Sequence, residues 1–489
     1  MDALVNVNNT TNALVWGSED IAYPPVLILL LATGLYLMVR LGFMPILKLP
    51  YAIGELFRKR EGGGEEGDVS PFSALMTALS STIGTGNIAG VAVAIAIGGP
   101  GAVFWMWVTA LVGMASKFAE GVLAVKFRET DRSGRHVGGP MYYIKNGMGP
   151  KWIWLGGVFA AFGILASWGT GASIQANSIA DALNANYGVA PWLSGLVLAA
   201  GAGAVILGGI KRIATVASKL VPAMAISYLA AGLVVIALNA EAVPAAFAAI
   251  VSNAFGFDAA KGGFIGGLLL LAMQKGVARG IFSNEAGQGS APIAHAAAKN
   301  KDPVNQGVVA MLGTFIDTIV VCSITALVIL TANIISADCA PFARESLILL
   351  PEACETGAPL TVAAFDKSLP GVGSHIVAVG LAVFGFTTIL GWSYYGERCA
   401  EFLFGERVIT PFRISWILVV FGGAATLMAE EGAAFTDVVS LFWLVADTLT
   451  GLMAAPNLIA LLVLSPLVAR MTRDYFEARR AAPAAAPAE

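Results

Sequence analysis

A long apolar stretch of this sequence is interrupted at its centre by residues that disfavour a helix. Residues 71–98 have the length and apolar character of a membrane-crossing segment, but Gly84 and Gly86 stand in their middle among hydroxyl and amide side chains. Each glycine weakens a helix by ~1 kcal/mol relative to alanine. Inside a bilayer, backbone that is not helical is tolerated only where protein or a water-filled cavity covers it. We therefore expect a broken helix whose free N–H and carbonyl groups can bind a ligand at mid-membrane depth.

A second interruption of the same kind lies at residues 280–290. Three glycines there accompany Ser283, Asn284 and Glu285 within another apolar stretch. Paired broken helices in corresponding positions of two halves of a chain point to the substrate site of a secondary transporter, near the middle of the bilayer. The two interruptions together therefore predict one transport site.

Composition assigns the whole chain to a membrane. Of its 489 residues, 57% are hydrophobic and 12% are charged, and the mean hydropathy is +0.75. These values are typical of a protein that crosses a bilayer many times, and they exclude an ordinary soluble domain. The net charge of −3 comes without any basic domain, so we expect a lipid bilayer and no nucleic acid as partner. Cys339 and Cys354 share one polar loop, where an oxidising compartment would allow a disulfide.

Apolar runs and their lengths predict an all-α membrane protein with eleven transmembrane helices. The predicted spans lie at residues 22–41, 70–97, 101–127, 151–186, 191–210, 215–239, 262–297, 304–332, 374–400, 411–429 and 435–468. The fourth, seventh and eleventh exceed the ~20 residues that a crossing needs. These three must therefore tilt, bend or extend beyond the lipid.

The distribution of basic residues predicts the orientation in the cell membrane. If the N-terminus lies outside, the loops that face the cytoplasm hold 22 Lys and Arg residues, and the outer segments hold 3. Cytoplasmic loops of membrane proteins carry such an excess of Lys and Arg. Because a miscount of one span would destroy the asymmetry, we expect the N-terminus outside and the C-terminus in the cytoplasm.

Opposite orientations of the two broken segments divide the chain into two halves. Residues 70–239 are predicted to form a first repeat of five helices, and residues 262–468 a second repeat of inverted topology, with residues 240–261 as the outer connection. Inverted repeats of this kind hold substrate and coupling ions where the broken helices cross. Residues 1–69 carry an outer segment, one extra helix and a cytoplasmic loop, and residues 469–489 form a cytoplasmic tail.

Four sequence motifs resemble one known family. They are STIGTGNIAG at residues 81–90, GGPMYY at 138–143, GIFSNEAGQGSA at 280–291 and GWSYYGE at 391–397. They are similar to the signatures of the alanine or glycine:cation symporter family (the sodium:alanine symporters), and the likeness covers about residues 20 to 470. The resemblance implies a LeuT-type fold of the amino acid–polyamine–cation superfamily, with two discontinuous helices. It also implies that the chain carries a small neutral amino acid together with sodium.

A zwitterionic amino acid needs an electropositive and an electronegative partner a few ångströms apart. The N–H groups of Thr85, Gly86 and Asn87, at the start of a half-helix, are placed to bind its carboxylate. Carbonyls before the second break, from Gly280 to Ser283, suit its ammonium group. The sequence thus predicts a substrate site made largely of backbone groups from both breaks.

The resemblance adds side chains to this backbone site. By similarity to the family, Asn87, Gln175, Phe282 and Trp392 would line the pocket. Gln175 could instead bond between helices, and the two aromatic rings could simply pack in the core. Glycines let a ligand approach and favour a small side chain, so we expect alanine and glycine as substrates. Because contacts to the carboxylate and ammonium fix only two substituents, we expect weak discrimination between L- and D-alanine.

Sodium is a hard cation, so hydroxyl and carbonyl oxygens should surround it. Thr387 and Thr388 place two adjacent hydroxyls inside an apolar run. In the LeuT-type fold that the resemblance implies, such a pair joins carbonyls of the first broken helix to form a sodium site. Carried over to this sequence, those carbonyls belong to Ser80 and Ile83, together with that of Phe384. The alternative is that both hydroxyls bond back to their own helix.

Charges inside predicted spans are costly and need an explanation, and two of the carboxylates there lie near the predicted site. Asp317, in the eighth span, is the candidate for a second cation or a proton. Its alternative is a structural carboxylate that is hydrogen-bonded between helices. Glu285 is expected to cap the half-helix that follows it rather than to contact the ligand.

Other functions stay open from the sequence. The nearer alternative is the same fold with another cargo, such as glutamine or a small organic cation, or with protons in place of sodium. The more distant is a membrane enzyme or a channel. The chain has no G-x-S-x-G or H-E-x-x-H motif, which argues against an enzyme. Its helix breaks are paired and antiparallel rather than arranged in a ring, which argues against a channel.

Overall fold

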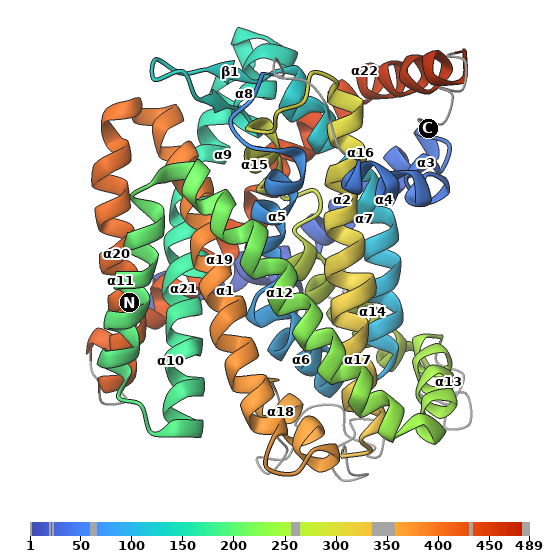
Figure 1. The fold of residues 1–489 in the computed structure, drawn as a ribbon, viewed down its shortest axis with the longest axis vertical. Helices are drawn as coiled ribbons and strands as arrows, with labels where there is room; N and C mark the ends of the chain where they lie inside the picture. The colour runs from blue at the N-terminus through green and yellow to red at the C-terminus, as the bar shows by residue number, and fades with distance from the viewer. Residues whose placement is uncertain are drawn as a thin grey trace, which may run out of the picture.

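The computed structural model describes residues 2–18, 21, 24–58, 66–255, 265–334, 357–429 and 434–481. This part of the chain is α-helical apart from one hairpin of two short strands, β1 (Glu129–Thr130) and β2 (His136–Val137). Figure 1 shows a bundle of long helices. The hairpin and the end of α22 (Ala454–Ala481) lie at one end of the bundle, and α13 (Val243–Ala254) and α18 (Gly357–Ser368) lie at the other.

Seven helical segments among the described residues are long and apolar enough to cross a bilayer. They are α7 (Gly101–Lys126), α9 (Ile153–Ala166) with α10 (Ile174–Tyr187), α12 (Gly209–Leu238), α16 (Pro303–Thr314) with α17 (Ser323–Thr331), α19 (Gly373–Phe404), α20 (Ile409–Ala425), and α21 (Ala434–Leu452) with α22. Shorter apolar helices include α2 (Pro25–Arg40), α6 (Ala89–Gly98) and α11 (Pro191–Ile206). The all-helical membrane protein predicted from the sequence is thus confirmed, and the count of eleven crossing helices stays a prediction.

Both predicted interruptions are breaks in the structure. α5 (Pro71–Thr82) ends before Gly84, a 3₁₀ turn η1 (Thr85–Asn87) follows, and α6 continues the segment. α14 (Ile265–Asn284) and α15 (Ala291–Ala296) enclose the second break. Because α7 packs along α14 and α15, and α19 packs along α5, both breaks lie inside the bundle rather than on its surface.

Short elements complete the chain between the long helices. They are α3 (Met44–Leu47), α4 (Leu49–Phe57), α8 (Pro140–Tyr143), and the 3₁₀ or π turns η2 (Ile144–Met148), η3 (Pro150–Trp152), η5 (Ala240–Ala242), η8 (Glu406–Val408) and η9 (Thr426–Met428). Two further π segments join long helices: η4 (Ser167–Ser173) between α9 and α10, and η7 (Phe315–Cys322) between α16 and α17. Single π turns of this kind are rare and occur mostly at functional sites.

The N-terminal helix α1 (Asp2–Trp16) lies outside the predicted spans, as do the shorter helices α3, α4, α8, α13 and α18. Its 15 residues mix apolar and amide side chains, so no apolar run marks it, and isolated helices of this length are marginal in water. It packs on α21, where Asn12 Nδ2 donates to Asp447 Oδ2 at 2.9 Å and Trp16 Nε1 donates to the Asp447 carbonyl at 3.3 Å. Tertiary contacts, rather than helix propensity, therefore stabilise it.

The C-terminal part also differs from the prediction. The predicted single span at 435–468 is two helices, α21 and α22, and α22 continues to Ala481 where a tail from residue 469 was expected. Its last turns are rich in arginine, so they lie beyond the apolar run that defined the span. Cys339 and Cys354, and the Ala/Pro-rich segment 482–489, lie outside the described residues.

Candidate functional site

The first break frees backbone donors next to Gly84. The Gly84 N–H would continue α5 by bonding to the Ser80 carbonyl, but it donates instead to Asn87 Oδ1 at 2.9 Å. Within the described residues, no hydrogen bond reaches the N–H groups of Thr85 and Gly86. The Asn87 N–H differs, because it donates to the Gly84 carbonyl at 3.2 Å. Two of the three predicted donors are therefore available to a carboxylate.

Hydroxyls from other helices satisfy the carbonyls that follow this break. Thr325 Oγ1 donates to the Asn87 carbonyl at 2.8 Å, and Thr361 Oγ1 donates to the Ile88 carbonyl at 3.1 Å. A carbonyl left unpaired in the hydrocarbon region would cost several kcal/mol. Helices α17 and α18 thus hold the irregular backbone in place and leave the opposite side of the break open to a ligand.

The second break follows from backbone conformations that favour glycine. Gly287 and Gly289 have φ of 81° and 87°, in the left-handed region, and Glu285 has φ of 55°. Such angles are unremarkable for glycine and costly for other residues. A helix cannot continue through three such residues within five positions, so the G-x-G pattern of the sequence ends α14 here.

This second break frees carbonyls on the side that faces the first break. The Ala286 N–H would bond to the Phe282 carbonyl in a continuous helix, but it donates to Asn284 Oδ1 at 3.0 Å. Among the described residues, no hydrogen bond ends at the carbonyls of Phe282 and Ser283. Two free acceptors at the C-terminal end of α14 therefore suit an ammonium group.

A small cavity lies between the two breaks. Its lining comes from both broken helices and from α9–α10, α19 and α21: Ser81, Thr82, Gly84, Gly86, Thr170, Gln175, Phe282, Ser283, Glu285, Gln288, Thr388, Trp392 and Thr450. Its volume is about 20 Å³, room for about one water molecule. A bound amino acid therefore requires these side chains to move apart slightly, and the movement grows with the size of the ligand.

Trp392 forms one wall of this cavity. Its indole N–H donates to Glu285 Oε1 at 3.0 Å, and its ring meets Tyr395 edge-on with 5.7 Å between centroids. A Cβ on Gly171 would lie 2.4 Å from Trp392 Cβ, so only glycine allows this approach. Glu285 also accepts a hydrogen bond from the Ser290 hydroxyl, which precedes α15. Glu285 therefore joins the wall to the Ser290 side chain, whereas no side chain caps the first N–H groups of α15, so the expected cap is not formed.

Gln175 connects two helices while it lines the cavity. Its Oε1 accepts a hydrogen bond from Thr85 Oγ1 at 3.1 Å, and its Nε2 donates to the Thr170 carbonyl at 3.3 Å. Thr170 lies in the π segment η4, and its hydroxyl is 3.1 Å from that of Thr450 on α21. The geometry agrees with both roles proposed for Gln175, because its side chain holds the walls together and borders the empty space.

Phe282, from the second break, also lines the cavity. The Trp16 ring of α1 meets Phe282 edge-on at 6.0 Å between centroids, and the Arg279 guanidinium carbon lies 5.8 Å from the ring centre. Phe282 is half-buried. The N-terminal helix, which no apolar run predicted, thus reaches the edge of the candidate site.

The two threonines proposed for sodium lie on α19 against the first break. Thr387 Oγ1 donates to the Phe384 carbonyl at 2.9 Å and Thr388 Oγ1 donates to the same carbonyl at 3.1 Å. Both thus bond back to their own helix, as the alternative described. A hydroxyl that donates keeps two lone pairs, so this bond does not prevent cation binding. A Cβ on Gly84 would lie 2.5 Å from Thr388 Oγ1, which places that hydroxyl directly beside the break.

Of the three carbonyls proposed for sodium, that of Phe384 accepts hydrogen bonds from both threonine hydroxyls, and those of Ser80 and Ile83 are free among the described residues. In the described part of the chain, no hydrogen bond ends at the carbonyl of Ser80 or of Ile83. α5 and α19 approach closely at this level, since a Cβ on Gly391 would lie 2.8 Å from Ser80 Oγ. Free carbonyls beside two hydroxyls form the oxygen-rich surroundings that a hard cation needs.

Asp317 is buried between the two broken helices. It accepts hydrogen bonds from Asn87 Nδ2 at 2.7 Å, from Ser283 Oγ at 2.8 Å and from Thr318 Oγ1 at 2.8 Å. It lies in the π segment η7 and does not line the cavity. These contacts are those of the structural alternative, a carboxylate that is hydrogen-bonded between helices.

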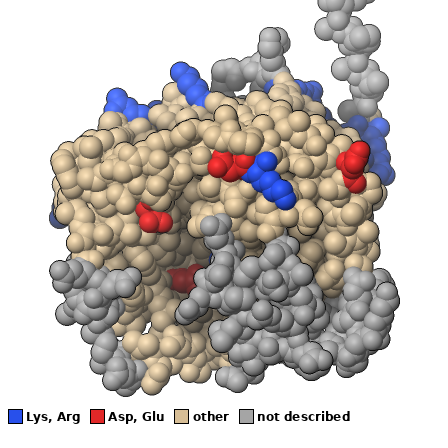
Figure 2. Space-filling model, turned by 90° about the horizontal axis from the view of Figure 1, so that it is seen from below, with Lys and Arg blue, Asp and Glu red and all other residues tan. Residues whose placement is uncertain are grey.

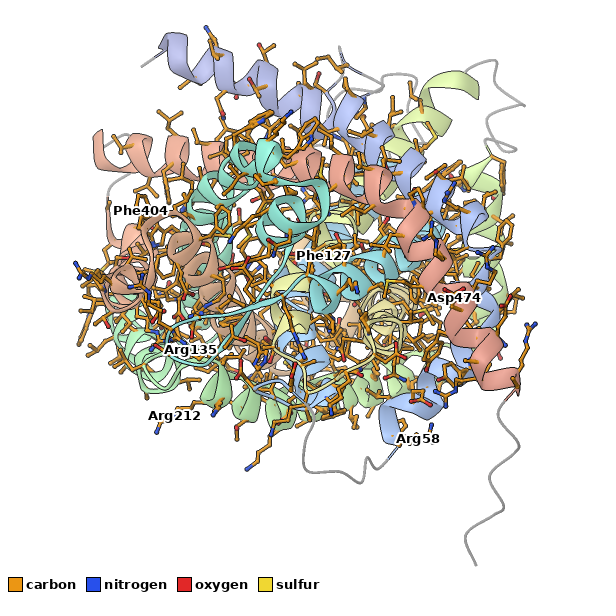
Figure 3. All side chains as sticks on the ribbon, turned by 90° about the horizontal axis from the view of Figure 1, so that it is seen from above. Arg58, Phe127, Arg135, Arg212, Phe404 and Asp474 are labelled. Carbon is orange, nitrogen blue, oxygen red and sulfur yellow. The ribbon has the colours of Figure 1, made fainter. Side chains whose placement is uncertain are left out.

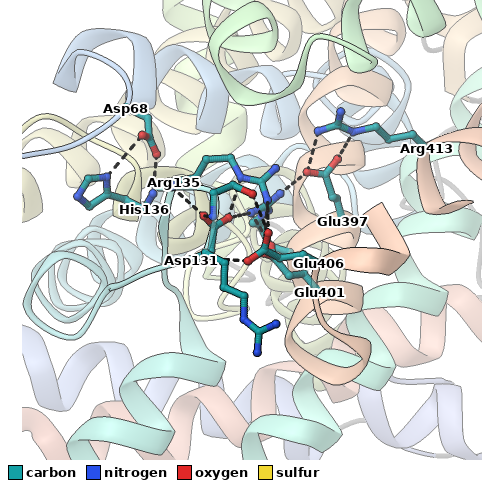
Figure 4. A network of polar contacts seen from close by, with 11 residues as sticks. Asp68, Asp131, Arg135, His136, Glu397, Glu401, Glu406 and Arg413 are labelled. Carbon is teal, nitrogen blue, oxygen red and sulfur yellow. Dashed lines mark hydrogen bonds and ion pairs between the residues drawn. The ribbon is translucent and has the colours of Figure 1, made fainter. Parts of the chain in front are cut away.

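A network of ion pairs lies at the end of the bundle that carries the hairpin (Figure 4). Arg413 on α20 lies 2.6 Å from Glu397 Oε2, and the buried Arg398 contacts Glu397 and lies 2.5 Å from Glu401. Arg135, next to β2, reaches Glu401 at 3.7 Å. Removing one partner of a buried ion pair costs about 3–5 kcal/mol. The network therefore ties the hairpin to α19 and α20.

The opposite end has a recess in its surface (Figure 2). This face lies on the side of α13 and α18, and acidic side chains lie in and beside the recess. Thr85, Gly86 and Phe282 remain half-buried, whereas Ser81 and Thr82 are buried. The candidate site is thus less covered at Thr85, Gly86 and Phe282 than at Ser81 and Thr82.

The structure brings most of the predicted substrate residues together. Gly86, Gln175, Phe282, Ser283 and Trp392 line the cavity. Thr85 lies behind Gln175, and Asn87 points to Asp317 instead of to the cavity. Of the predicted sodium ligands, Thr388 is the one that lines the part of the cavity that the described residues form. These assignments stay predictions.

Some lining residues were not predicted. Ser81, Thr82 and Gln288 stand within the motifs and could have been found there, while Thr170 and Thr450 lie in ordinary apolar stretches. Glu285 was expected to be structural, and it borders the cavity as well. The π segment η4 brings Thr170 to the site, and α21, near the end of the chain, brings Thr450. No local sequence pattern predicts either contact.

Comparison with known sequences gives one consistent result. The family model described as the sodium:alanine symporter family matches residues 1–487. The chain is 49% identical over 478 residues to the sodium/alanine symporter AgcS of Methanococcus maripaludis, which covers 97% of this chain and 98% of the relative. It is 36% identical over 485 residues to a probable sodium/glutamine symporter, GlnT of Bacillus subtilis, which covers 98% of this chain and 92% of that relative.

The fold is similar to that of a solved transporter. A crystal structure of a mutant manganese transporter of Eremococcus coleocola matches with a TM-score of 0.51 and covers 85% of this chain and 87% of that one. The sequence identity is 13%, so the likeness concerns the fold alone. It supports the LeuT-type fold that the sequence predicted.

Proposed function

Because the chain belongs to the sodium:alanine symporter family, we propose that it imports small neutral amino acids, alanine and glycine, together with sodium. Membership in a family of transporters excludes the membrane enzyme that the sequence left open. The work of such a protein is to bind both cargoes at one site and to expose that site to each side in turn.

One observation carries this proposal for the substrate. The cavity between the breaks has free N–H groups of Thr85 and Gly86 near one border and free carbonyls of Phe282 and Ser283 near another. A carboxylate is stabilised by the former and an ammonium group by the latter. An amino acid in zwitterionic form carries both groups on neighbouring atoms, which matches two half-helix ends that meet at a small cavity.

We further propose that sodium binds beside this cavity, between α5 and α19. The free carbonyls of Ser80 and Ile83 and the hydroxyls of Thr387 and Thr388 would be its ligands, with the carbonyl of Phe384. Each is a hard oxygen donor of the kind that such a cation prefers. Because Thr388 touches both the break and the cavity, sodium bound there would order the backbone that holds the amino acid.

The size of the cavity favours a small cargo. Phe282 and Trp392 leave a volume of about 20 Å³, and extra volume in a packed site costs about 1–3 kcal/mol. Glutamine is the second candidate, since one relative is named a probable sodium/glutamine symporter. Its side chain would have to displace the rings much further than the methyl group of alanine.

We also propose the full topology of eleven crossing helices. The extra helix α2 would precede two inverted repeats of five, and α5–α6, α11 and α14–α15 would join the seven long segments. The N-terminus would lie outside and the C-terminus in the cytoplasm, as the 22 inner and 3 outer basic residues favour. The end that carries the network of ion pairs would then face the cytoplasm.

Uptake into proteoliposomes tests the proposed cargo and coupling. Labelled alanine should accumulate with an inward sodium gradient and fail to accumulate when choline replaces sodium. Unlabelled glycine and D-alanine should compete well, serine less well, and glutamine and leucine hardly at all. Competition by glutamine as strong as that by alanine would favour the second candidate, and equal uptake in choline would contradict sodium coupling.

A further inference from the structure

A second, larger hollow lies far from the transport site, beside the last turns of α22. It has a volume of about 620 Å³ and lies between the end of α2, α3 and α22. Its charged lining is strongly unbalanced: Arg40, Lys48, Arg470, Arg473, Arg480 and a single acid, Glu477. We call it the basic groove.

The sequence of α22 places these cations on one face of the helix. Pro466, Arg470, Arg473, Glu477 and Arg480 follow one another at steps of four and three residues. This spacing sets side chains in a row along one side of an α-helix. One face of α22 therefore forms a continuous side of the groove and carries its arginines in a row.

The other face of α22 is fixed by α4. The Tyr475 hydroxyl lies 2.7 Å from that of Tyr51, and Arg479 Nη2 lies 3.1 Å from Glu55 Oε1. Burial alone would raise the pKa of Glu55, but hydrogen bonds from Asn305 and Arg58 and the charge of Arg479 outweigh it and lower that pKa. Glu55 thus stays ionised and holds Arg479 away from the groove.

The cations of the basic groove have few partners of their own. Among the described residues, the one ion pair that these cations form joins Arg473 to Asp474 at 4.0 Å, and both side chains are more than half exposed. Lys48 lies over the Phe476 ring at 5.4 Å, and Arg40 donates to the Tyr36 hydroxyl at 3.0 Å. Five cations beside one carboxylate create a positive potential that attracts an anion.

The helices that line the groove also expose apolar side chains. Val39 on α2, Leu47 on α3 and Val463 on α22 are 59%, 70% and 54% exposed. α2 and α22 run side by side at this level, where the Tyr36 and Ser465 hydroxyls lie 3.1 Å apart. Apolar side chains exposed on membrane helices face lipid tails, and basic residues at the helix ends face headgroups.

We propose that the basic groove binds an anionic phospholipid from the leaflet on the side of the C-terminus. Its phosphate would lie among Arg470, Arg473 and Arg480, and its acyl chains would lie along the exposed side chains of α2 and α22. Basic pockets between membrane helices are known to select anionic headgroups in this way. A zwitterionic lipid would gain less, because its own cationic group would meet the same arginines.

Native mass spectrometry of the purified full-length protein tests this site directly. The protein would be titrated with phosphatidylglycerol and, separately, with phosphatidylethanolamine of the same chains. We expect one phosphatidylglycerol to bind with clear preference. Inorganic phosphate at millimolar concentration should leave that lipid bound. Equal retention of both lipids, or displacement by inorganic phosphate, would overturn the assignment to an anionic lipid.

A charge-matched pair of variants locates the site. Arg470→Ala with Arg480→Ala should weaken phosphatidylglycerol binding by about fivefold for each lost charge, or about 25-fold together. Arg132→Ala with Arg407→Ala removes the same charge from exposed positions near the hairpin and α20. Figure 3 shows this region, marked by Arg135 and Phe404, on the opposite side of the molecule from Asp474 on α22. Equal weakening in both double variants would overturn the proposal, and so would wild-type affinity in the first.

Discussion

Gly86→Ala adds a single methyl group to the candidate substrate site without disturbing the protein around it. A Cβ at Gly86 would have one protein atom within 4 Å, Phe282 Cδ1 at 3.9 Å, which is an ordinary contact. Gly86 lies in the 3₁₀ turn η1, and its φ is not in the left-handed region. Alanine therefore fits the backbone, and the new methyl group occupies space that the ligand should need.

The expected magnitude follows from the size of the cavity. With a volume of about 20 Å³, the site has no room for a second methyl group unless its walls move further. Overpacking of this kind costs about 1–3 kcal/mol, or roughly 5–150-fold in affinity. Glycine has no side-chain methyl group, so its affinity should fall less, and the ratio of glycine to alanine affinity should rise.

Two neighbouring glycines provide controls. Gly90→Ala adds the same methyl group within α6 where no atom lies within 4 Å, so binding should be unchanged. Gly84→Ala would place Cβ 2.5 Å from Thr388 Oγ1, so binding of alanine and of glycine should both fail. Competition binding on purified protein, with thermal unfolding to verify the fold, measures all three variants. A folded Gly86→Ala protein with wild-type affinity for alanine would refute the placement of the site.

Three further changes test other parts of the structure. Trp392→Phe removes the hydrogen-bond donor to Glu285 and some side-chain volume. Alanine should therefore bind roughly 5–150-fold less tightly, and larger amino acids should begin to compete. Unchanged selectivity in a competition panel would argue against Trp392 as a wall of the cavity. Asp317→Asn replaces an acceptor of three hydrogen bonds. The free energy of unfolding, measured by denaturation, should fall by about 1–3 kcal/mol. An unchanged free energy of unfolding would mean that the carboxylate is not structural. Glu397→Gln weakens the ion pairs of Figure 4 that hold this end of the bundle together. The buried thiol of Cys399 should then become more accessible and react faster with a membrane-permeant alkylating reagent. An unchanged reaction rate would show that the network does not control access to this end.

The positions of both breaks could be predicted from the sequence because local chemistry determines them. Gly287 and Gly289 adopt left-handed backbone angles, and Gly84 turns its N–H away from the helix. Glycine and short polar side chains favour such departures wherever they occur. The predicted site of free N–H and carbonyl groups follows from those departures with little help from the rest of the fold.

The remaining details depend on contacts between distant parts of the chain. The Asn87 side chain turns toward Asp317, 230 residues away, and Thr450 meets Thr170 across 280 residues. No periodicity or local propensity contains that information. The same holds for α1, whose mixed composition does not predict a helix. Hydrogen bonds from Asn12 and Trp16 to Asp447 stabilise it.

The dependence of alanine binding on sodium shows whether the two cargoes are coupled at the first break. If both cargoes share the backbone of the first break, saturating sodium should tighten alanine binding by about 5–150-fold, the usual range of coupling between two sites. The dissociation constant of alanine would be measured with and without sodium for the wild type, for Thr387→Ala with Thr388→Ala, and for the matched serine pair. We expect the alanine pair to reduce this factor to nearly one and the serine pair, which keeps both hydroxyls, to retain it. The same factor in the wild type and in a folded alanine pair would contradict the proposed sodium site.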